Sequence, residues 1–368
     1  MQSKYELSPL PVPPDSHLGL QLFHAIRRSR PGAPLLVKRY ECSTLCQVDS
    51  LAKTALTLAR AEGGLQLLEV VPIEEAKGRY TVSFVYRMDG QVDEEVLHRN
   101  DGHSTHRPFL EGYTMKQQIR CRNDLYTLAV AWSEASDREV MVKESCHYVL
   151  RKLRPQIAKA LIHARLEHAN VRRIVDIAVC ENHAGYAVVL MFEKFPQNLK
   201  TEIAQRTPLQ YTETELWELL RDVGQALVYM HGQVKGRQQV AHCNVKPSKV
   251  MRGTDGQYRL GGFGMAVADT ALAECVDGTV AFMSAEARTA LSSGDLYDPY
   301  KGDVFALGAT LLCAARLQEE PFSEVQPQEM EAEILALPYS EGFKQVLSRM
   351  LCFSPTDRPN IADICTSL

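Results

Sequence analysis

The feature that most constrains the fold is a duplication within the first half of the chain. The stretches LAKTALTLARAEGGLQLLEV from Leu51 and IAKALIHARLEHANVRRIVDI from Ile157 both place apolar residues at three- and four-residue spacing. Each then runs into an apolar strand-like segment. A second strand-like run follows in both places, RYTVSFVYR from Arg79 and GYAVVLMFE from Gly185. The offset between the copies is 106 residues for the helix-like and for the strand-like runs.

Two further strand-like runs precede each helix-like stretch. PLLVKRYE contains Lys38 and EVMVKES contains Lys143, at an offset of 105 residues. Upstream, LQLFHAIRR stands before the turn SRPG, and YTLAVAWSE stands before the turn ASD. Each copy therefore predicts strand, turn, strand, helix, strand, strand. A chance likeness of two amphipathic helices is the alternative, but the shared order and near-constant offset favour a duplication.

The pattern becomes mostly helical after residue 193. ETELWELLRDVGQALVYMHGQ from Glu213 and EGFKQVLSRMLCF from Glu341 predict amphipathic helices. DVFALGATLLCAARL from Asp303 is apolar almost all round and predicts a buried helix. A strand-rich part followed by a helix-rich part predicts the α+β class. At the start, the four prolines of MQSKYELSPLPVPPDS predict an extended arm.

Composition argues against several classes of function. The formal net charge is −4, and no run of five Lys or Arg residues occurs, so we expect no binding to nucleic acid. No segment approaches the roughly 20 apolar residues that span a bilayer, so we expect no membrane span. The first residues lack the apolar core of a signal peptide. We therefore expect an intracellular protein, either cytoplasmic or cytoskeletal.

We expect no metal site. The ten cysteines form no CxxC pair, and they predict reduced thiols. Cys42 and Cys46 lie one helical turn apart, and His98, His103 and His106 lie in a polar linker. Neither group has the accompanying ligands that a metal ion requires.

Five motifs in the second part occur in an order that resembles the protein kinase family. VAHCNVKPSKVM is similar to the catalytic loop I-V-H-R-D-L-K-P-x-N, and LGGFGMA is similar to the segment around D-F-G. GTVAFMSAEA is similar to G-T-x-x-Y-M-A-P-E, GDVFALG to the buried D-V-W-S-L-G helix, and SPTDRPN to the family's last motif. Upstream, VVLMFEKFPQNLK resembles the last N-lobe strand with the hinge, and LEHANVRRIVDI resembles the stretch after helix αC.

The resemblance covers roughly residues 107–368 and implies a two-lobed kinase-like fold, with a β-rich N-lobe and a helical C-lobe. The first copy of the duplication then resembles an additional N-lobe in front of it. We predict a proline-rich arm over residues 1–16, an N-lobe-like repeat over 17–100, an N-lobe over 101–193 and a C-lobe over 194–368.

The resemblance also implies that groups needed for phosphoryl transfer are replaced. The family's catalytic aspartate falls on Asn244, whose amide is not a base at neutral pH. The second metal-ligating asparagine falls on Lys249 and the D-F-G aspartate on Gly262, so neither position offers the oxygen ligand that Mg²⁺ prefers. The αC glutamate falls on Lys159. The glycine-rich loop falls on RCRNDLYTLAVAW, which contains no glycine.

A few groups could still contact a nucleotide. The resemblance places Lys143 at the β3 lysine, keeps Lys246 in the catalytic loop and puts Glu193 near the hinge. Leu125 and Tyr126 place side chains where phosphates would lie. Solvated or salt-bridged lysines are the alternative interpretation, and we prefer it. We therefore expect neither ATP nor Mg²⁺ as a cofactor.

Residues that carry the architecture of the family are retained. His242, Phe263 and Asp303 match residues that, in the family, hold the two lobes together. Glu286 and Arg358 match a buried ion pair that anchors the activation segment to the C-lobe. Removing one partner of such a pair is strongly destabilising.

The residues together predict a pseudokinase that is not an enzyme and that binds other proteins. It would act as a scaffold, as an allosteric partner of an active kinase, or as a structural subunit of a larger assembly. A divergent active protein kinase and a metal-independent nucleotide sensor are the alternatives. Cys243 takes the place of the arginine that reads a phosphorylated activation segment in the family. We therefore do not expect regulation of that kind through Thr270 or Thr279.

Overall fold

The chain forms two compact units in a computed structural model. One unit holds residues 1–165 and 173–194, and the other holds residues 166–172 and 195–368. The predicted N-lobe-like repeat over 17–100 lies in the first unit, and so does the predicted N-lobe over 101–193 except for residues 166–172. The residues that the structure describes are 5–10, 21–27, 35–42, 47–48, 51–52, 65–76, 79–88, 112–119, 126–147, 154–182, 185–206, 209–233, 239–268, 273–274, 279–321 and 327–366.

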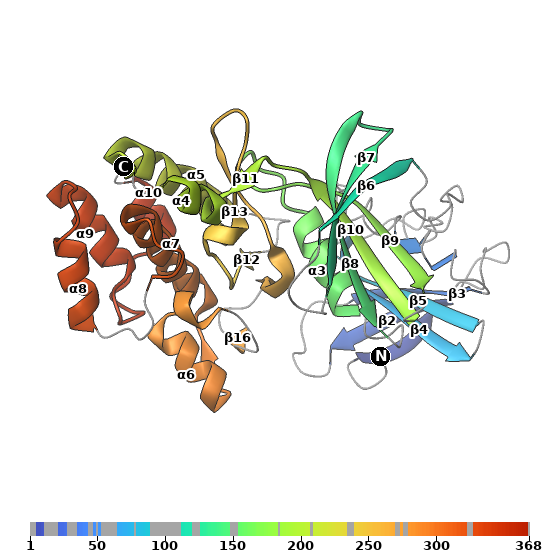
Figure 1. Cartoon of the computed structure of the whole chain (residues 1–368). Helices are drawn as coiled ribbons and strands as arrows, with labels where there is room; N and C mark the ends of the chain where they lie inside the picture. The colour runs from blue at the N-terminus through green and yellow to red at the C-terminus, as the bar shows by residue number, and fades with distance from the viewer. Residues whose placement is uncertain are drawn as a thin grey trace. The chain divides into compact units, whose positions relative to one another are not determined.

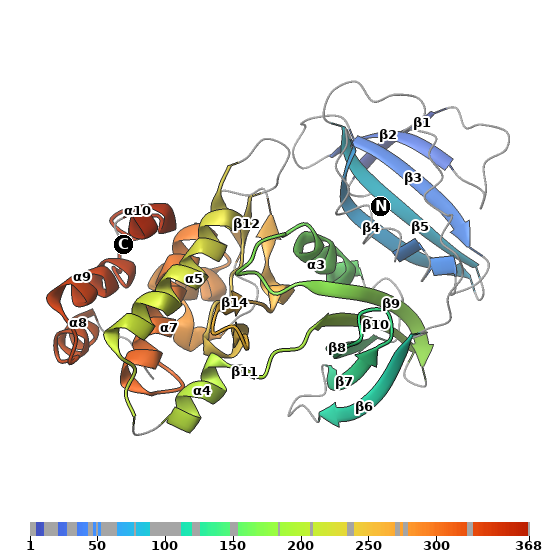
Figure 2. The ribbon, with the colours of Figure 1, turned by 90° about the horizontal axis from the view of Figure 1, so that it is seen from above.

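The first unit contains two five-stranded antiparallel sheets with the same strand order (Figure 2). The first sheet has the order β1-β2-β3-β5-β4, and the second has the order β6-β7-β8-β10-β9. Their strands are β1 (Tyr5–Leu10), β2 (Gln21–Arg27), β3 (Leu35–Cys42), β4 (Leu65–Ala76), β5 (Arg79–Met88), β6 (Tyr113–Ile119), β7 (Thr127–Ser133), β8 (Arg138–His147), β9 (Ile174–Asn182) and β10 (Gly185–Glu193).

The registers of the two sheets also correspond. Lys38 of β3 lies opposite Phe84 of β5, and Lys143 of β8 lies opposite Leu190 of β10. Residues that are 105 or 106 positions apart in sequence therefore occupy the same place in the two sheets. The additional N-lobe-like repeat of the α+β fold is thus visible both in strand order and in register.

One helix, α3 (Arg154–Ala164), packs between strands of both sheets and contacts β4, β9 and β10. Ile157 and Leu161 are four residues apart, so they lie on one helix face, and both are buried. They belong to an apolar core that joins the two copies. Its other members include Leu36, Tyr40, Leu67, Val70, Phe84, Ile174, Ile177, Val179 and Val188.

Residues Tyr5–Leu10 lie within the predicted arm, but the structure places them in strand β1. This strand pairs in antiparallel register with β2 from Tyr5 opposite Arg27 to Leu10 opposite Leu22. Pro9 is compatible with β1 because this is the edge strand of the described sheet, and proline within sheets is found on edge strands. Of the helix predicted from Leu51, only residues 51–52 belong to the described part of the chain.

The second unit is mainly helical (Figure 1). Its helices are α4 (Leu199–Arg206), α5 (Glu213–His231), α6 (Ala285–Ser293), α7 (Pro299–Arg316), α8 (Pro327–Leu335), α9 (Glu341–Met350) and α10 (Ile361–Thr366). The 3₁₀ helices among the described residues of this unit are η2 (Pro247–Lys249), η3 (Phe263–Met265) and η4 (Val280–Phe282). Its short strands are β11 (Gln197–Asn198), β12 (Val240–Ala241), β13 (Val250–Arg252), β14 (Tyr258–Leu260), β15 (Val267–Ala268), β16 (Ala273–Glu274) and β17 (Leu296–Tyr297).

Helix α7 forms the centre of this unit. It is buried along almost its whole length, as its all-round apolar pattern predicts, and it packs against α5 and α9. The Asp298 carboxylate caps its first turn by accepting from the amides of Tyr300 and Lys301. A reciprocal capping box between Thr212 and Glu215 starts α5. Among the described helices, none is long and apolar enough to cross a bilayer.

Candidate functional site

The catalytic-loop motif is fixed by one buried carboxylate of α7. Asp303 accepts a hydrogen bond from the backbone amide of His242 at 2.7 Å and another from the amide of Cys243 at 2.8 Å. The Nε2 atom of His231 lies 3.0 Å from the same carboxylate. Cys243 has a φ of 60°, in the left-handed region that non-glycine residues seldom adopt. Asp303 therefore holds the loop in the turn that places Asn244.

The ring of His242 links this loop to the segment around Gly262. Its Nδ1 atom accepts from the amide of Asn244 at 3.2 Å, and its Nε2 atom lies 3.0 Å from the carbonyl oxygen of Gly261. These two contacts require a neutral imidazole with its hydrogen on Nε2. Complete burial lowers the pKa of His242, and this outweighs the opposing attraction of Asp303. The ring of Phe263 packs against it with centroids 4.9 Å apart.

Asn244 belongs to a hydrogen-bonded set with Lys246 and Thr279. The Lys246 ammonium donates to the Thr279 hydroxyl at 2.6 Å, and that hydroxyl donates to the Asn244 amide oxygen at 3.4 Å. The set joins the catalytic-loop motif to the GTVAFMSAEA motif. An amide at this position can orient a hydroxyl group, but it cannot accept its proton at neutral pH.

Lys249 fills the space that a side chain at position 262 would occupy. Gly262 has a φ of 87°, and a Cβ atom built on it would lie 2.4 Å from Cδ and 3.1 Å from Cε of Lys249. The amide of Gly261 donates to the carbonyl oxygen of Lys249 at 2.8 Å, which ties the two segments together. The positively charged side chain of Lys249 therefore lies where the family pattern has a carboxylate.

Mg²⁺ does not fit this pair of positions. The ion requires oxygen ligands, and the side chains of Gly262 and Lys249 supply none. Within the part of the chain that the structure describes, no cluster of three or more His, Cys, Asp or Glu side chains is arranged to hold a metal ion.

The predicted residues of the first unit lie on β8, β10 and α3. Lys143 is partly buried, and its ammonium lies 4.4 Å from the centroid of the Tyr126 ring. Lys159 is partly buried on α3. The carboxylate of Glu193, at the end of β10, accepts from the amide of Arg173 at 3.2 Å. Leu125 lies outside the described residues.

The structure brings Glu286 and Arg358 together. Arg358 is fully buried, and its Nη1 and Nη2 atoms donate to the two carboxylate oxygens of Glu286 at 2.7 and 3.3 Å. The guanidinium also donates to the carbonyl oxygens of Cys352 at 2.9 and 2.8 Å and of Lys301 at 2.8 Å. The pair joins the first turn of α6 to the loop before α10.

Comparison with known proteins identifies the family. The family model described as protein kinase domain matches residues 129–368. The chain belongs to the protein kinase family. Its relatives include the serine/threonine-protein kinases Nek2 of Mus musculus, 26% identical over 274 residues, and of Homo sapiens, 25% identical over 271 residues. The matches cover 69% and 68% of this chain, and they span 56% of the length of each relative.

The prediction that this protein is not an enzyme is therefore wrong. A kinase-domain match over most of the chain and relatives that are serine/threonine kinases point to a kinase. The prediction counted each replaced catalytic or metal-binding residue as a lost function. It assumed that the residue that replaces it contributes nothing to the site. At Gly262 the place is instead filled by the chain of Lys249, which brings a positive charge.

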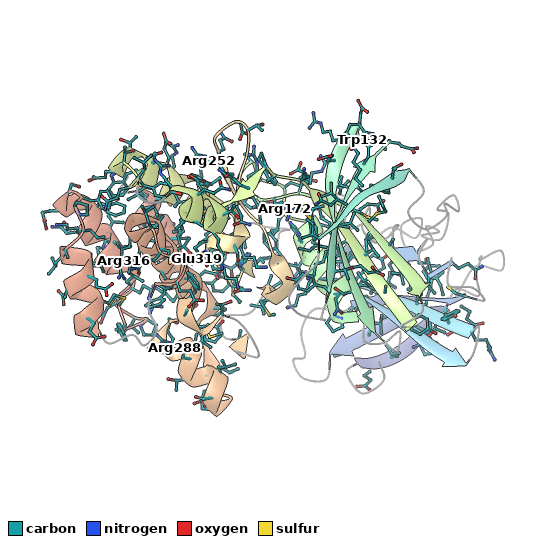
Figure 3. The ribbon with its side chains drawn as sticks, viewed as in Figure 1. Trp132, Arg172, Arg252, Arg288, Arg316 and Glu319 are labelled. Carbon is teal, nitrogen blue, oxygen red and sulfur yellow. The ribbon has the colours of Figure 1, made fainter. Side chains whose placement is uncertain are left out.

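Sequence reasoning considered Thr279 only as a phosphorylation site and missed its contacts with Lys246 and Asn244. The available signal was its place in the GTVAFMSAEA motif. A buried network was missed altogether: Glu202 of α4 accepts from Arg252, labelled in Figure 3, at 2.5 Å and from the Tyr258 hydroxyl at 3.3 Å. Glu202 lies in a short polar stretch, and no motif marks it.

Proposed function

We propose that this chain is a divergent protein kinase whose nucleotide site uses the ammonium group of Lys249 in place of a divalent metal ion. The observation that carries the proposal is the packing of Lys249 against Gly262. In the family pattern an aspartate at the position of Gly262 binds Mg²⁺, and the two together carry a net charge of plus one. A glycine beside a lysine gives the same net charge, and an ammonium group attracts phosphate oxygens without needing further ligands.

The other residues of the site are suited to a phosphoryl transfer that depends on how the acceptor hydroxyl is positioned. Phosphoryl transfer passes through a loose transition state, so the acceptor hydroxyl needs orientation more than early loss of its proton. Asn244 would hold that hydroxyl through its amide, while Lys246 and Lys249 would face the phosphates. Because Asn244 does not take the proton, we expect slow transfer. Serine and threonine hydroxyls are the proposed acceptors, by analogy with the names of the relatives.

The first experiment measures nucleotide binding by calorimetry, with ATP in EDTA and with ATP in excess Mg²⁺. We expect binding in EDTA that Lys249→Met removes. Lys200→Met is the matched control, because Lys200 is half exposed and paired with Glu319 on the surface. Binding that requires Mg²⁺, or that survives Lys249→Met unchanged, would contradict the proposal.

The second experiment measures transfer of the γ-phosphate to a mixed protein substrate. Asn244→Asp restores a carboxylate and should raise the transfer rate on the order of a hundredfold. Asn360→Asp makes the same chemical change at an exposed loop position and should have no effect. Binding in EDTA without transfer by either the native chain or Asn244→Asp would instead support a metal-independent nucleotide sensor.

Holding a partner protein is the second candidate function, and the additional sheet favours it. That sheet has its own register and, beside the shared core, an apolar cluster of its own that includes Ala25, Leu35 and Val85. It exposes Ile26 of β2 to 42% of its full area. The partner would be another protein, such as an active kinase or a subunit of a larger assembly. Purification from native cells should lose that partner with Ile26→Glu and keep it with Leu335→Glu, which changes an exposed leucine of α8. Equal recovery of every partner with both variants would contradict this role.

A further inference from the structure

Lys249 and Gly262 flank the open end of one small hairpin. Strand β13 begins directly after Lys249, and strand β14 ends two residues before Gly262. Val250 lies opposite Leu260 in the register of the two strands. At the same end, the amide of Gly261 donates to the carbonyl oxygen of Lys249 at 2.8 Å. The place of the Lys249 side chain over Gly262 therefore depends on how this hairpin is held.

Helix α4 supports both the hairpin and the turn that carries Lys249. It contacts η2 and β13, and it directly follows strand β11, which pairs with β13. The buried residues of α4 are Leu199, Glu202 and Ile203. Contacts of the two apolar side chains have no preferred direction, so Glu202 is the member of this face that can fix the hairpin at a defined place.

The carboxylate of Glu202 binds both strands of the hairpin. Its Oε1 atom accepts from Arg252, the last residue of β13, at 2.5 Å, and from the hydroxyl of Tyr258, the first residue of β14, at 3.3 Å. Burial raises the pKa of Tyr258, so its hydroxyl stays protonated and remains a donor. Glu202 is only 5% exposed, and hydrogen bonds to a buried charged group are strong ones.

Other polar contacts hold only one side of the hairpin. The carboxylate of Asp222 in α5 accepts from the amide of Tyr258 at 2.9 Å, and the Asn170 side chain donates to the carbonyl oxygen of Tyr258 at 2.9 Å. Both contacts act on β14, the strand that leads to Gly262. Glu202 also reaches β13, the strand that follows Lys249.

We propose that Glu202 is a positioning residue that holds the Lys249 side chain over Gly262 by fixing β13 and β14 to α4. The inference rests on the proposed function, because it concerns the ammonium group assigned there to the phosphates. A binding group is effective only when supporting residues hold it within about 0.5 Å of its working place. Without the carboxylate, Arg252 loses its counter-ion, and β13 loses the bond that fixes it to α4.

The first test measures hydrogen exchange without nucleotide in the peptide over residues 249–262. Its rate is divided by that of a peptide from α7, so that a general loss of stability cancels. Glu202→Ala should raise this relative rate about three- to tenfold. Glu202→Gln keeps an acceptor oxygen and should stay within about twofold of the native value. Glu286→Ala is the matched control, because it also takes a carboxylate from a pair with an arginine of this unit, and it should leave the relative rate unchanged.

The second test measures ATP binding in EDTA by calorimetry, at a temperature where circular dichroism shows every variant folded. Glu202→Ala should weaken binding about three- to tenfold, and Glu202→Gln should restore it to within about twofold of the native chain. Glu286→Ala should bind ATP as the native chain does. A merely structural role of Glu202 would instead give the two alanine variants the same effect.

Two kinds of failure can be told apart. The inference is overturned if Glu202→Ala leaves the relative exchange rate unchanged, if it binds ATP as well as a native chain that does bind, or if Glu286→Ala has equal effects. Failure of the proposed function would appear as no ATP binding by the native chain in EDTA. The exchange measurement would then still decide whether Glu202 holds the hairpin.

Discussion

The pair between Glu286 and Arg358 gives the sharpest test of how the second unit is held together. We consider Glu286→Ala, which removes the carboxylate and leaves the guanidinium of Arg358 buried. Arg358 is fully buried, whereas the Glu286 side chain is 18% exposed. The change therefore isolates the effect of a buried positive charge that has lost its counter-ion.

The magnitude follows from the contacts. Breaking a buried ion pair by removing one partner costs about 3–5 kcal/mol. Here the guanidinium keeps its hydrogen bonds to the carbonyl oxygens of Cys352 and Lys301, and solvent reaches part of the Glu286 side chain. Both features reduce the penalty. We therefore expect the free energy of unfolding to fall by about 2–3 kcal/mol.

The two tryptophans of the chain allow the second unit to be followed by itself. Trp132, labelled in Figure 3, lies in β7 of the first unit, and Trp217 lies in α5 of the second. Trp217 donates to Glu213 at 3.1 Å and packs edge-on against Phe343, so its fluorescence depends on the native packing of that unit. In a Trp132→Phe background, urea unfolding monitored by fluorescence reports the second unit.

Glu341→Ala is the matched control for this measurement. Glu341 is 73% exposed and pairs with Lys344 on the surface of α9, so its loss should change the free energy of unfolding by less than about 0.5 kcal/mol. If Glu286→Ala costs no more than about 1 kcal/mol, the typical upper value for an exposed pair, the reasoning from burial is refuted.

Three further predictions concern the second unit. Gly262→Ala should destabilise it by about 1–3 kcal/mol more than Gly256→Ala in urea unfolding, because both glycines have positive φ but only a Cβ at 262 meets another side chain. The Asp255 carboxyl should titrate with a pKa of about 2 by NMR, because hydrogen bonds from Arg259 stabilise its charged form. In Arg259→Met that pKa should rise but stay below about 3.9, because the amide of Gln257 still donates to the carboxylate; the contribution of the pair is present above about pH 3.9 and is lost as the pH falls towards 2. His242 should stay neutral below the ordinary imidazole pKa, because burial lowers its pKa. The unfolded chain then takes up the proton first, so stability should fall as the pH drops below about 6.5, and a His242 ring still neutral by NMR at that point checks the cause.

Periodicity and duplication were enough to predict much of the fold. The offset between the copies predicted four strands and one helix in the same order in each copy, and the structure adds a first strand to each sheet, β1 and β6. The all-round apolar pattern after Asp303 predicted the buried helix α7. Strand β1 was not predicted, because prolines dominate its surroundings and its pairing with β2 is decided by the sheet already present.

The site was predictable in its residues but not in their contacts. Motif order located Asn244, Lys249 and Gly262, because each stands at a defined place in a short pattern. The packing of Lys249 over Gly262 joins two loops, and no local pattern specifies such a contact.

The two sheets of equal strand order have a consequence for the chain while it folds. A hairpin of one sheet has the length and order to pair with strands of the other, and exchange of this kind is a common failure of chains with repeated modules. Both ladders shift register at the same place, between Val85 and Tyr86 of β5 and between Met191 and Phe192 of β10, but the β4–β5 ladder has a second shift, after Glu74. A strand that crossed to the other sheet would be out of step with its new partner at this second shift, and a one-residue slip turns side chains to the wrong face. The second bulge thus favours pairing of each copy with itself and opposes strand exchange as the chain is synthesised.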